Sequence, residues 1–271
     1  RKSRSQTPMK VYVGTDLEGV AGVVTFYTQT SPGGSGYTQA MKLLTAEINA
    51  AVEGMLEEGV DDVLVCDGHG PGAVSFEMLH PAAKLLHGRP LAPRALRDEI
   101  VQTYDVCVMI GQHAMAGCQR GDMNHTQSSK SIDYYRLNGN PIGEIAQFAL
   151  YQGALGLPLI YLSGDEEACR EAEQLVSGIT TTAVKQSLSR NSAISLSAEE
   201  SRRRIREGMR AAIRAQRENP LPPLVWEPPF TLEKRFFHTD TADAAEGGGA
   251  ERIDGQTVRY TANEIRSIVY R

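Results

Sequence analysis

The alternation of short apolar runs with helical patterns is the feature that most constrains the fold of this 271-residue chain. Apolar runs that predict β-strands fall at residues 11–13, 60–70, 105–114 and 157–165. Between the first two runs, residues 37–58 carry Leu44, Ile48 and Val52 at helical spacing, and the pattern stops at Gly59. Strands that alternate with helices form parallel sheets, so we expect an α/β fold with a mainly parallel sheet flanked by helices.

Turn and capping residues extend this pattern along the chain. The Asn138-Gly139 dipeptide predicts a β-hairpin, and a helix is expected to follow it over residues 144–155. A strand is predicted at residues 179–187. Ser197 and Glu200 have the spacing of a capping box, which predicts the start of a long helix.

A cluster of prolines suggests how the chain is divided into domains. Five prolines lie between residues 220 and 229, and they indicate a boundary near residue 219. The tail beyond them predicts short strands and helices around the glycines 247–249. We therefore predict three parts: a disordered extension or tag remnant at 1–8, an α/β metal-binding catalytic domain at 9–218, and a small α+β part at 219–271.

Composition and charge exclude several classes of function. A net charge of −5 and a pI near 5.7 are not those of a nucleic-acid-binding domain, and no apolar run approaches the roughly 20 residues that span a bilayer. The seven arginines of the helix that begins near Ser197 are interpreted as a solvated face. The four cysteines form no C-x-x-C pair, so Cys66 and Cys107 are expected to be buried thiols in a reducing compartment, the cytoplasm.

Acidic and histidine side chains follow three of the predicted strands. Asp16 and Glu18 end the first strand, Asp67 and His69 end the second, and His113 ends the third. Residues two apart on an extended chain point to the same side. In open α/β sheets the carboxyl ends of the strands border one crevice, so we expect Asp16, Glu18, His69 and His113 to converge there.

A divalent cation explains why these side chains gather. Crowded carboxylates repel one another, whereas a bound cation reverses that penalty. Carboxylate and imidazole ligands suit Zn²⁺, and also Mn²⁺ or Co²⁺. With Glu144, at the start of a predicted helix, there are five candidate ligands, which suit two metal ions sharing a carboxylate, predicted to be Asp16. Taken singly, each residue also fits a helix cap, a loop acid or a core histidine, and Asp67 fits either a turn or a partner of a ligand.

The remaining histidines differ in their surroundings. His125 lies in the polar loop "GCQRGDMNHTQSS" after the third strand, where an imidazole suits a general acid or base, or a donor to an oxyanion. A loop histidine without a task is the alternative. His80 precedes a proline and is interpreted as structural, while His87 and His238 are interpreted as surface or packing residues.

Several motifs resemble those of one known family, the M55 metallopeptidases, which are D-aminopeptidases of the dipeptide-transport operon type. The resemblance runs from Met9 to about Ala198 and weakens in the tail. Its carriers, in the order of the chain, are "TDLEGVAGV", "LTAEINAAVEGMLEEG", "VLVCDGHG", "LHPAAKL", "IGQHAMAG", "MNHTQSS", "LNGNPIGEIAQFA", "LSGDEEACREAEQL" and "TTAVKQSLSRNSAISLS".

The resemblance implies a function and a set of site residues. It implies two zinc ions per chain on Asp16, Glu18, His69, His113 and Glu144, with His125 as the catalytic histidine. The expected activity is removal of N-terminal residues, D-Ala among them, from short peptides by attack of a metal-bridging hydroxide. It also implies a ring-shaped homo-oligomer, with a decamer of two stacked pentamers as the candidate.

Two other functions fit parts of the same pattern. A two-metal phosphoesterase would use the same ligands, with Arg120 as the nearby candidate for binding phosphate. A peptide-binding or structural ring protein would need no catalytic histidine. The segment "TQTSPGGSGYTQA" after the first motif is a variable loop, so substrate preference is not fixed by the resemblance.

Overall fold

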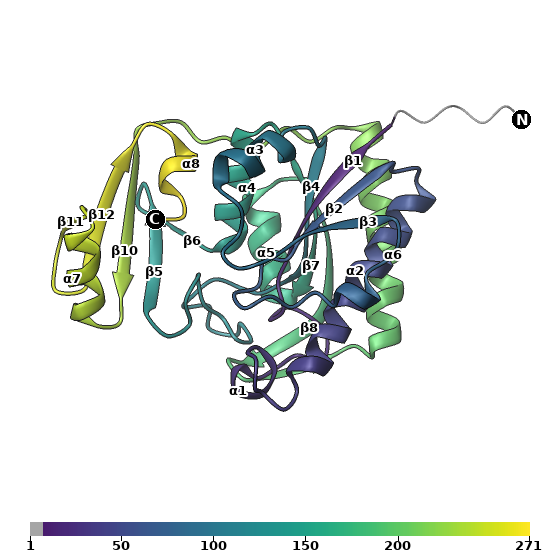
Figure 1. Cartoon of the computed structure of the whole chain (residues 1–271), viewed down its shortest axis with the longest axis horizontal. Helices are drawn as coiled ribbons and strands as arrows, with labels where there is room; N and C mark the ends of the chain where they lie inside the picture. Colours follow the sequence, from purple (N-terminus) through teal and green to yellow (C-terminus); the bar gives the residue numbers. More distant parts are fainter. Residues whose placement is uncertain (1–7) are drawn as a thin grey trace, which may run out of the picture.

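The computed structural model describes residues 8–271, so the predicted extension, apart from Pro8, lies outside the described residues. Its larger sheet, sheet A, has seven strands (Figure 1). In spatial order they are β3 (Ala83–Leu86), β2 (Asp62–Cys66), β1 (Lys10–Thr15), β4 (Val106–Gln112), β7 (Leu159–Asp165), β8 (Thr180–Ser189) and β9 (Ser192–Ser195). Neighbours from β3 to β8 are parallel, and only β9 is antiparallel. The predicted α/β fold with a mainly parallel sheet is confirmed.

Helices cover both faces of sheet A. The long helices α2 (Tyr37–Glu57) and α6 (Ala198–Glu218) pack on one face, to the right in Figure 1. The other face is covered by α3 (Arg94–Val101), α4 (Glu144–Ala154) and α5 (Glu166–Leu175). The short helices α1 (Phe26–Gln29) and η1 (Phe76–Met78) lie in the loops after β1 and β2. Strands buried on both sides explain the nearly continuous apolar runs in the sequence.

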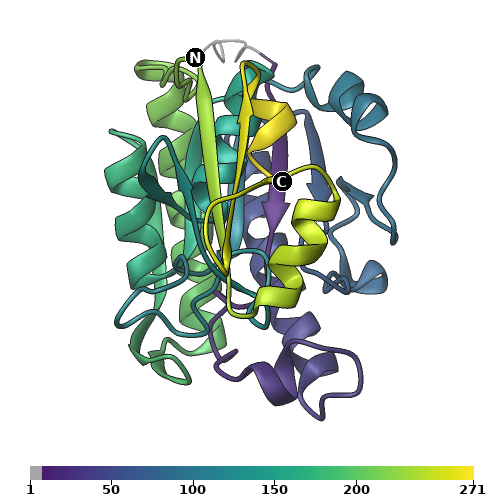
Figure 2. The same cartoon turned by 90° about the vertical axis from the view of Figure 1, so that its left-hand side faces the viewer.

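A second, antiparallel sheet, sheet B, lies beyond α4 (Figure 2). Its strands are, in spatial order, β11 (Glu251–Arg252), β12 (Thr257–Ala262), β10 (Phe230–Phe236), β5 (Ile132–Leu137) and β6 (Asn140–Ile142), with α7 (Thr239–Gly247) and α8 (Ile265–Ile268) beside them. Because β5 and β6 belong to this sheet, the predicted boundary at residue 219 does not separate one sheet from the other. The division into domains remains a prediction.

Helix α4 packs against both sheets. Ile145, Phe148 and Ala149 belong to the apolar core under sheet A. Ala146 and Leu150, on the other side of the helix, belong to the core of sheet B. Both sides of the helix are therefore covered, and nine of its eleven residues are buried, the exceptions being Glu144 and Ala154 at its two ends.

Local sequence signals account for several element boundaries. Asn138 and Gly139 both have positive φ, 51° and 81°, as the predicted two-residue hairpin turn requires. The Ser197 hydroxyl accepts a hydrogen bond from the Glu200 amide at 3.2 Å, which confirms the predicted start of α6. Several elements, among them β3, α3, α5 and β9, were not predicted. Asp165 caps α5 by accepting a hydrogen bond from the Ala168 amide.

The arginines of α6 face solvent and pair with acids. Arg206 and Arg210 lie 3.1 Å from carboxylates of Glu53 and Glu57 on α2. The predicted solvated face is therefore confirmed.

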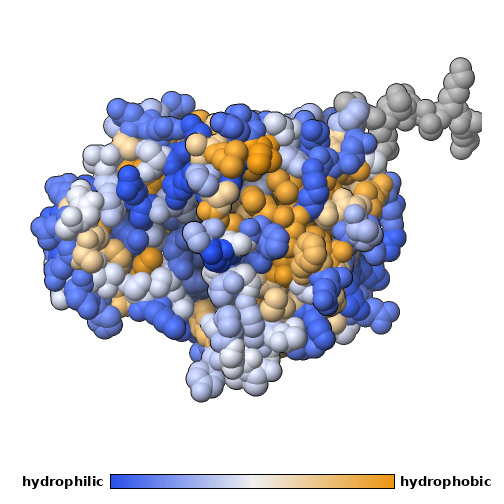
Figure 3. All heavy atoms as spheres, viewed as in Figure 1, coloured by the Kyte–Doolittle hydropathy of each residue, from blue (hydrophilic) through white to orange (hydrophobic). Residues whose placement is uncertain are grey.

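No helix among residues 8–271 is long and apolar enough to cross a membrane. Figure 3 shows hydrophobic residues gathered over the part of the face occupied by β2, β3 and α3. Leu96 and Ile100 of α3 and Phe76 of η1 are exposed to solvent.

Candidate active site

The candidate site lies where the order of the parallel strands reverses. Strand β1 pairs with β2 on one side and with β4 on the other, so the connections after β1 and β4 open a crevice at their carboxyl ends. The two backbones touch there. The Gly19 amide donates to the Gly111 carbonyl, and a Cβ at Gly19 would lie 2.0 Å from the Gln112 carbonyl oxygen. Only glycine permits this approach, which brings the acids after β1 next to His113.

Asp16 is at the centre of the converging side chains. Its Oδ1 lies 3.1 Å from His69 Nδ1, and its Oδ2 lies 3.1 Å from His113 Nε2. Glu18 Oε2 is also 3.1 Å from His69 Nδ1. The two oxygens of Asp16 therefore face two different histidines, which is the arrangement that a carboxylate shared by two cations requires.

Glu144 and His125 complete the cluster from the opposite side. Glu144, the first residue of α4, places Oε1 3.6 Å from His113 Nε2 and 3.7 Å from His125 Nε2. The rings of His113 and His125 stack with centroids 4.1 Å apart and an angle of 13° between their planes. Ligand atoms within 4.8 Å of one another form two sets that share His113: Asp16, Glu18 and His113, and His113, His125 and Glu144. The position of His125 is therefore compatible with two roles, metal ligand and catalytic residue.

A backbone carbonyl fixes one ring nitrogen of each histidine. His69 Nε2 donates to the Thr30 carbonyl at 2.7 Å, His113 Nδ1 to Ala114 at 2.9 Å, and His125 Nδ1 to Met123 at 2.8 Å. The other nitrogen of each ring faces the carboxylates. Histidine ligands of metals are oriented in this way by an outer hydrogen bond.

Two buried atoms test whether a metal fits here. Glu18 Oε2 and His113 Nε2 are buried and make no hydrogen bond. An unpaired buried polar group costs about 1–3 kcal/mol, and native proteins keep few of them. Carboxylate oxygen and imidazole nitrogen atoms that converge in this way fit a divalent cation such as zinc. The residues present therefore suit a metal centre.

The electrostatics of the cluster lead to the same conclusion. Burial, followed by the charge of Asp16, raises the pKa of Glu18 above its usual range. Burial also raises the pKa of Glu144 to about 7. Burial opposes ionisation of His69, but Asp16 and Glu18 outweigh it and raise its pKa to about 12. Such strong attraction of a proton between two acids is the behaviour expected of a cation site.

His125 shows the opposite shift. Burial, and then the nearby His113, lower the pKa of His125 to about 3. Its imidazole is therefore neutral at pH 7, with a lone pair on Nε2. Met123 and Gln127 on either side of it have φ of 48° and 64°, a strained conformation for residues other than glycine. Strain of this kind is concentrated at functional loops.

Several supporting residues were not found by sequence reasoning. Lys185 of β8 is completely buried, and its ammonium group donates to Asp122 Oδ2 at 2.7 Å and to the carbonyls of Glu18 and Val23. It thereby ties the loop of Glu18 to the loop of His125. Arg89 donates to the carbonyls of Asp67 and His69 and so holds the loop after β2.

The other residues considered in the sequence have local roles. The Asp67 carboxylate accepts hydrogen bonds from the amides of Ala73 and Val74, which are the contacts of a turn residue. His80 accepts from the Ala82 amide, and His87 stacks on Phe76. His238 precedes the first residue of α7. Cys66 and Cys107 are buried free thiols, as predicted.

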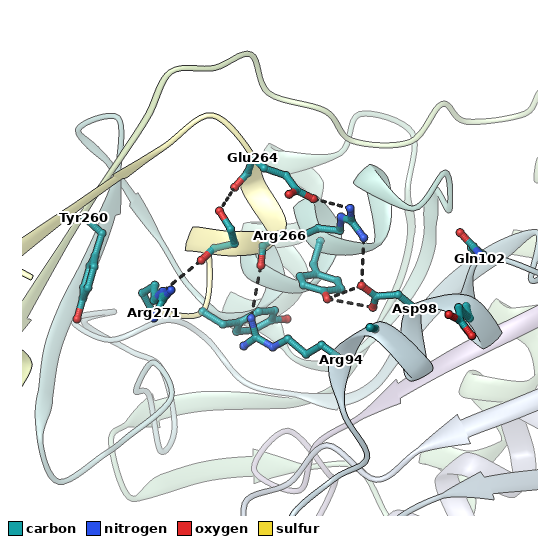
Figure 4. Close-up of a pocket in the computed structure, with 12 residues that line it drawn as sticks. Arg94, Asp98, Gln102, Tyr260, Glu264, Arg266 and Arg271 are labelled. Carbon is teal, nitrogen blue, oxygen red and sulfur yellow. Dashed lines mark hydrogen bonds and ion pairs between the residues drawn. The ribbon is translucent and has the colours of Figure 1, made fainter. Parts of the chain in front are cut away.

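Two cavities meet at the cluster. The outer cavity, about 280 Å³, is lined by Glu18, His69, His125 and Lys130, among others. The inner cavity, about 210 Å³, extends from Asp16 and Glu144 toward Tyr270. Asp16 and Glu144 line both. A third and larger cavity, about 920 Å³, lies between α3 and the C-terminal segment, where Arg266 pairs with Asp98 (Figure 4).

Comparison with known proteins assigns the chain to a family. The sequence profile of the Peptidase M55 family, described as D-aminopeptidase, matches residues 9–270. The chain belongs to the M55 family. Membership makes this M55 chain a hydrolase of the metallo-aminopeptidase class. The match continues to residue 270, beyond Ala198, where the resemblance of the motifs weakens.

This M55 chain is similar to a curated protein and to a solved structure. A D-aminopeptidase of Bacillus subtilis (strain 168) is 30% identical over 260 residues, which cover 95% of this chain and 93% of the relative. A solved structure has a TM-score of 0.89 and 28% sequence identity, and the match covers 97% of this chain and 94% of that one. It is described as the Zn-dependent D-aminopeptidase DppA from Bacillus subtilis, a self-compartmentalizing protease.

Proposed function

We propose that this M55 chain is a zinc-dependent aminopeptidase that removes N-terminal D-amino acids, D-Ala among them, from short peptides. One observation carries the proposal: three carboxylates and three histidines converge at the carboxyl ends of β1, β2 and β4, and Glu18 Oε2 and His113 Nε2 are buried there without a hydrogen bond. The ligands proposed for two zinc ions are Asp16, Glu18, His69, His113 and Glu144, with Asp16 shared.

Side chains of the site have separate roles in the proposed reaction. When bound, zinc would polarise the scissile carbonyl and lower the pKa of the attacking water. The neutral His125 orients that water by accepting its hydrogen bond at Nε2, and the proton passes to the leaving amine. The hydrogen bond from its Nδ1 to the Met123 carbonyl keeps that nitrogen free for the task. A carboxylate of the cluster receives the substrate's free N-terminal ammonium group, which restricts cleavage to the end of the peptide.

Assembly and location form part of the proposal. The relative DppA is described as self-compartmentalizing, and the exposed apolar residues of α3 and η1 suit contact with another protein surface. Both support a ring-shaped homo-oligomer, with a decamer as the proposed size. The four free cysteines, three of them buried, suit a reducing compartment such as the cytoplasm.

Metal analysis combined with peptide assays tests the function. We expect two zinc ions per chain, loss of D-alanyl peptide hydrolysis on chelation, and recovery with Zn²⁺, Mn²⁺ or Co²⁺. His69→Asn should lower the zinc content, whereas His87→Asn, the matched control outside the cluster, should not. Full activity of the metal-free protein would overturn the mechanism. Equal rates on L- and D-alanyl peptides would overturn the D preference alone.

The competing function is phosphoester hydrolysis by the same metal centre. The described residues that line the two cavities of the site include Lys130 but not Arg120, which was the expected phosphate-binding residue. Lys130 is exposed at the rim. An aryl phosphate assayed beside a D-alanyl anilide separates the two functions, and we expect turnover of the anilide.

A further inference from the structure

The inner cavity has a defined shape set by buried side chains. Tyr12, Met109 and Phe148 form apolar walls, and the rings of Tyr12 and Phe148 stack with centroids 6.0 Å apart. A Cβ at Gly14 would lie 2.7 Å from Phe148, so glycine is needed to leave room for that ring. The volume of about 210 Å³ equals that of about seven water molecules, at about 30 Å³ each. It suits one amino-acid side chain.

Two buried glutamines in this cavity have no protein partner. Gln112, the last residue of β4, is 2% exposed, and Gln152 of α4 is 6% exposed. Gln112 Nε2 and Gln152 Oε1 are buried and unpaired, and neither side chain makes a hydrogen bond within the described chain. A buried carboxamide without a partner is costly and is conspicuous in a native structure. Both carboxamide side chains line the cavity, and their unused hydrogen-bonding capacity points to a ligand that carries a neutral hydrogen-bonding group.

The position of the cavity indicates which part of a peptide it receives. Asp16 and Glu144 line both the inner and the outer cavity, so a peptide bond that reacts at the cluster lies at their junction. The inner cavity is the smaller of the two, about 210 Å³ against about 280 Å³, and the outer cavity reaches the exposed Lys130 at the rim. A chain that continues toward solvent fits the outer cavity, which leaves the inner one for the N-terminal residue.

We infer that the inner cavity is the binding site for the N-terminal side chain of the substrate, and that Gln112 and Gln152 select side chains ending in a hydroxyl or carboxamide over apolar side chains of equal size. This inference rests on the proposed aminopeptidase function and adds the class of residue that is removed. The stem of such a side chain contacts Tyr12, Met109 and Phe148, and its polar end pairs with the two glutamines. A site built to hydrogen-bond a substrate group discriminates against the analogue that lacks it.

The test compares peptides that differ only in this polar group. D-threonyl and D-valyl peptides have nearly the same shape, as do D-asparaginyl and D-leucyl peptides. We expect kcat/KM to favour the polar member of each pair by about tenfold. Gln152→Met and Gln112→Met should bring each ratio close to one. Because each ratio comes from a single enzyme preparation, partial unfolding or incomplete metal loading does not alter it. Gln39→Met, the same change on the exposed side of α2, should leave the ratios as in the wild type.

Equilibrium binding separates failure of this inference from failure of the proposed function. Calorimetry with free D-threonine and D-valine needs no turnover, and D-threonine should bind about tenfold more tightly. Wild-type protein that cleaves D-alanyl peptides but treats threonyl and valyl peptides alike would overturn the subsite and leave the function intact. Protein that cleaves no peptide, but prefers D-threonine in a manner that depends on Gln152, would overturn the function and support the subsite.

Discussion

Replacing Lys185 with methionine tests how the buried ammonium group supports the site. Methionine keeps most of the aliphatic stem and removes the charge that faces Asp122. Both side chains are completely buried, and breaking a buried ion pair by removing one partner costs about 3–5 kcal/mol. The carbonyls of Glu18 and Val23 lose a donor as well. We expect Lys185→Met to lower the free energy of unfolding by about 4 kcal/mol, close to the low end of the total for a typical domain.

Urea unfolding of the metal-free protein measures this loss without a contribution from zinc binding. The matched control is Lys84→Met on β3, whose partner Asp62 lies 2.8 Å away, but whose own side chain is 61% exposed. An exposed pair contributes about 1 kcal/mol or less. The double variant Lys185→Met/Asp122→Leu should recover part of the loss, because no buried charge is left unpaired. If Lys185→Met cost no more than Lys84→Met, the role given to this ion pair would be wrong.

The same variant should also weaken zinc binding. Lys185 donates to the backbone at Glu18, which is a proposed ligand. Loss of an outer partner of a ligand typically lowers metal affinity by about 10- to 100-fold. Competition with a zinc-binding dye measures this affinity, and unchanged affinity in folded Lys185→Met protein would restrict the role of Lys185 to stability.

Three further changes test other parts of the structure. His125→Gln should lower kcat by about 10²- to 10⁴-fold with the zinc content unchanged, and parallel loss of zinc would instead make His125 a ligand. Burial raises the pKa of Glu47 from 4.5 to about 7, so the folded state holds this proton more tightly than the unfolded state. Stability should therefore fall by on the order of 1–3 kcal/mol as the pH rises from about 4.5 to about 7, and urea titrations of Glu47→Gln should lack this part of the slope. Ser197→Ala removes the cap of α6 and should cost about 1 kcal/mol in thermal or urea unfolding, whereas Ser197→Asp should retain most of the stability.

The cluster could be located from the sequence because the topology of a parallel sheet determines where the ends of its strands lie. Asp16, Glu18, His69 and His113 each follow a strand, and parallel strands place their carboxyl ends on one edge. The structure brings these four together with Glu144 and His125. Their identity as metal ligands remains a prediction.

The supporting residues could not be predicted because their environment is created by the tertiary structure. Lys185 lies in a strand that is mostly polar, TTTAVKQSLS, where a lysine normally faces solvent. Its burial follows from the loops of Glu18 and Asp122, which are distant in the sequence. Likewise Gln112 and Gln152 come from different elements, and only the packed fold shows that they share a cavity.

Sheet B was hidden from local patterns for a related reason. Strand β10 pairs with β5, and Leu232 lies opposite Leu137 across nearly one hundred intervening residues. Periodicity predicts that a segment is a strand but does not identify such a remote partner. The prolines between the two segments indicated a domain boundary, whereas the hydrogen bonds of sheet B join residues on both sides of it.

The position of α4 makes the C-terminal part of the chain a component of the catalytic machinery. One face of this helix supplies Glu144 and Phe148 to the site, and the opposite face rests on the strands of sheet B. A protein shortened at residue 219 would leave Leu150 and its neighbours open to water and would remove Tyr270 from the end of the inner cavity. We therefore expect such a shortened protein to lose activity even if sheet A still folds. A smaller version of the enzyme must keep the residues after 219.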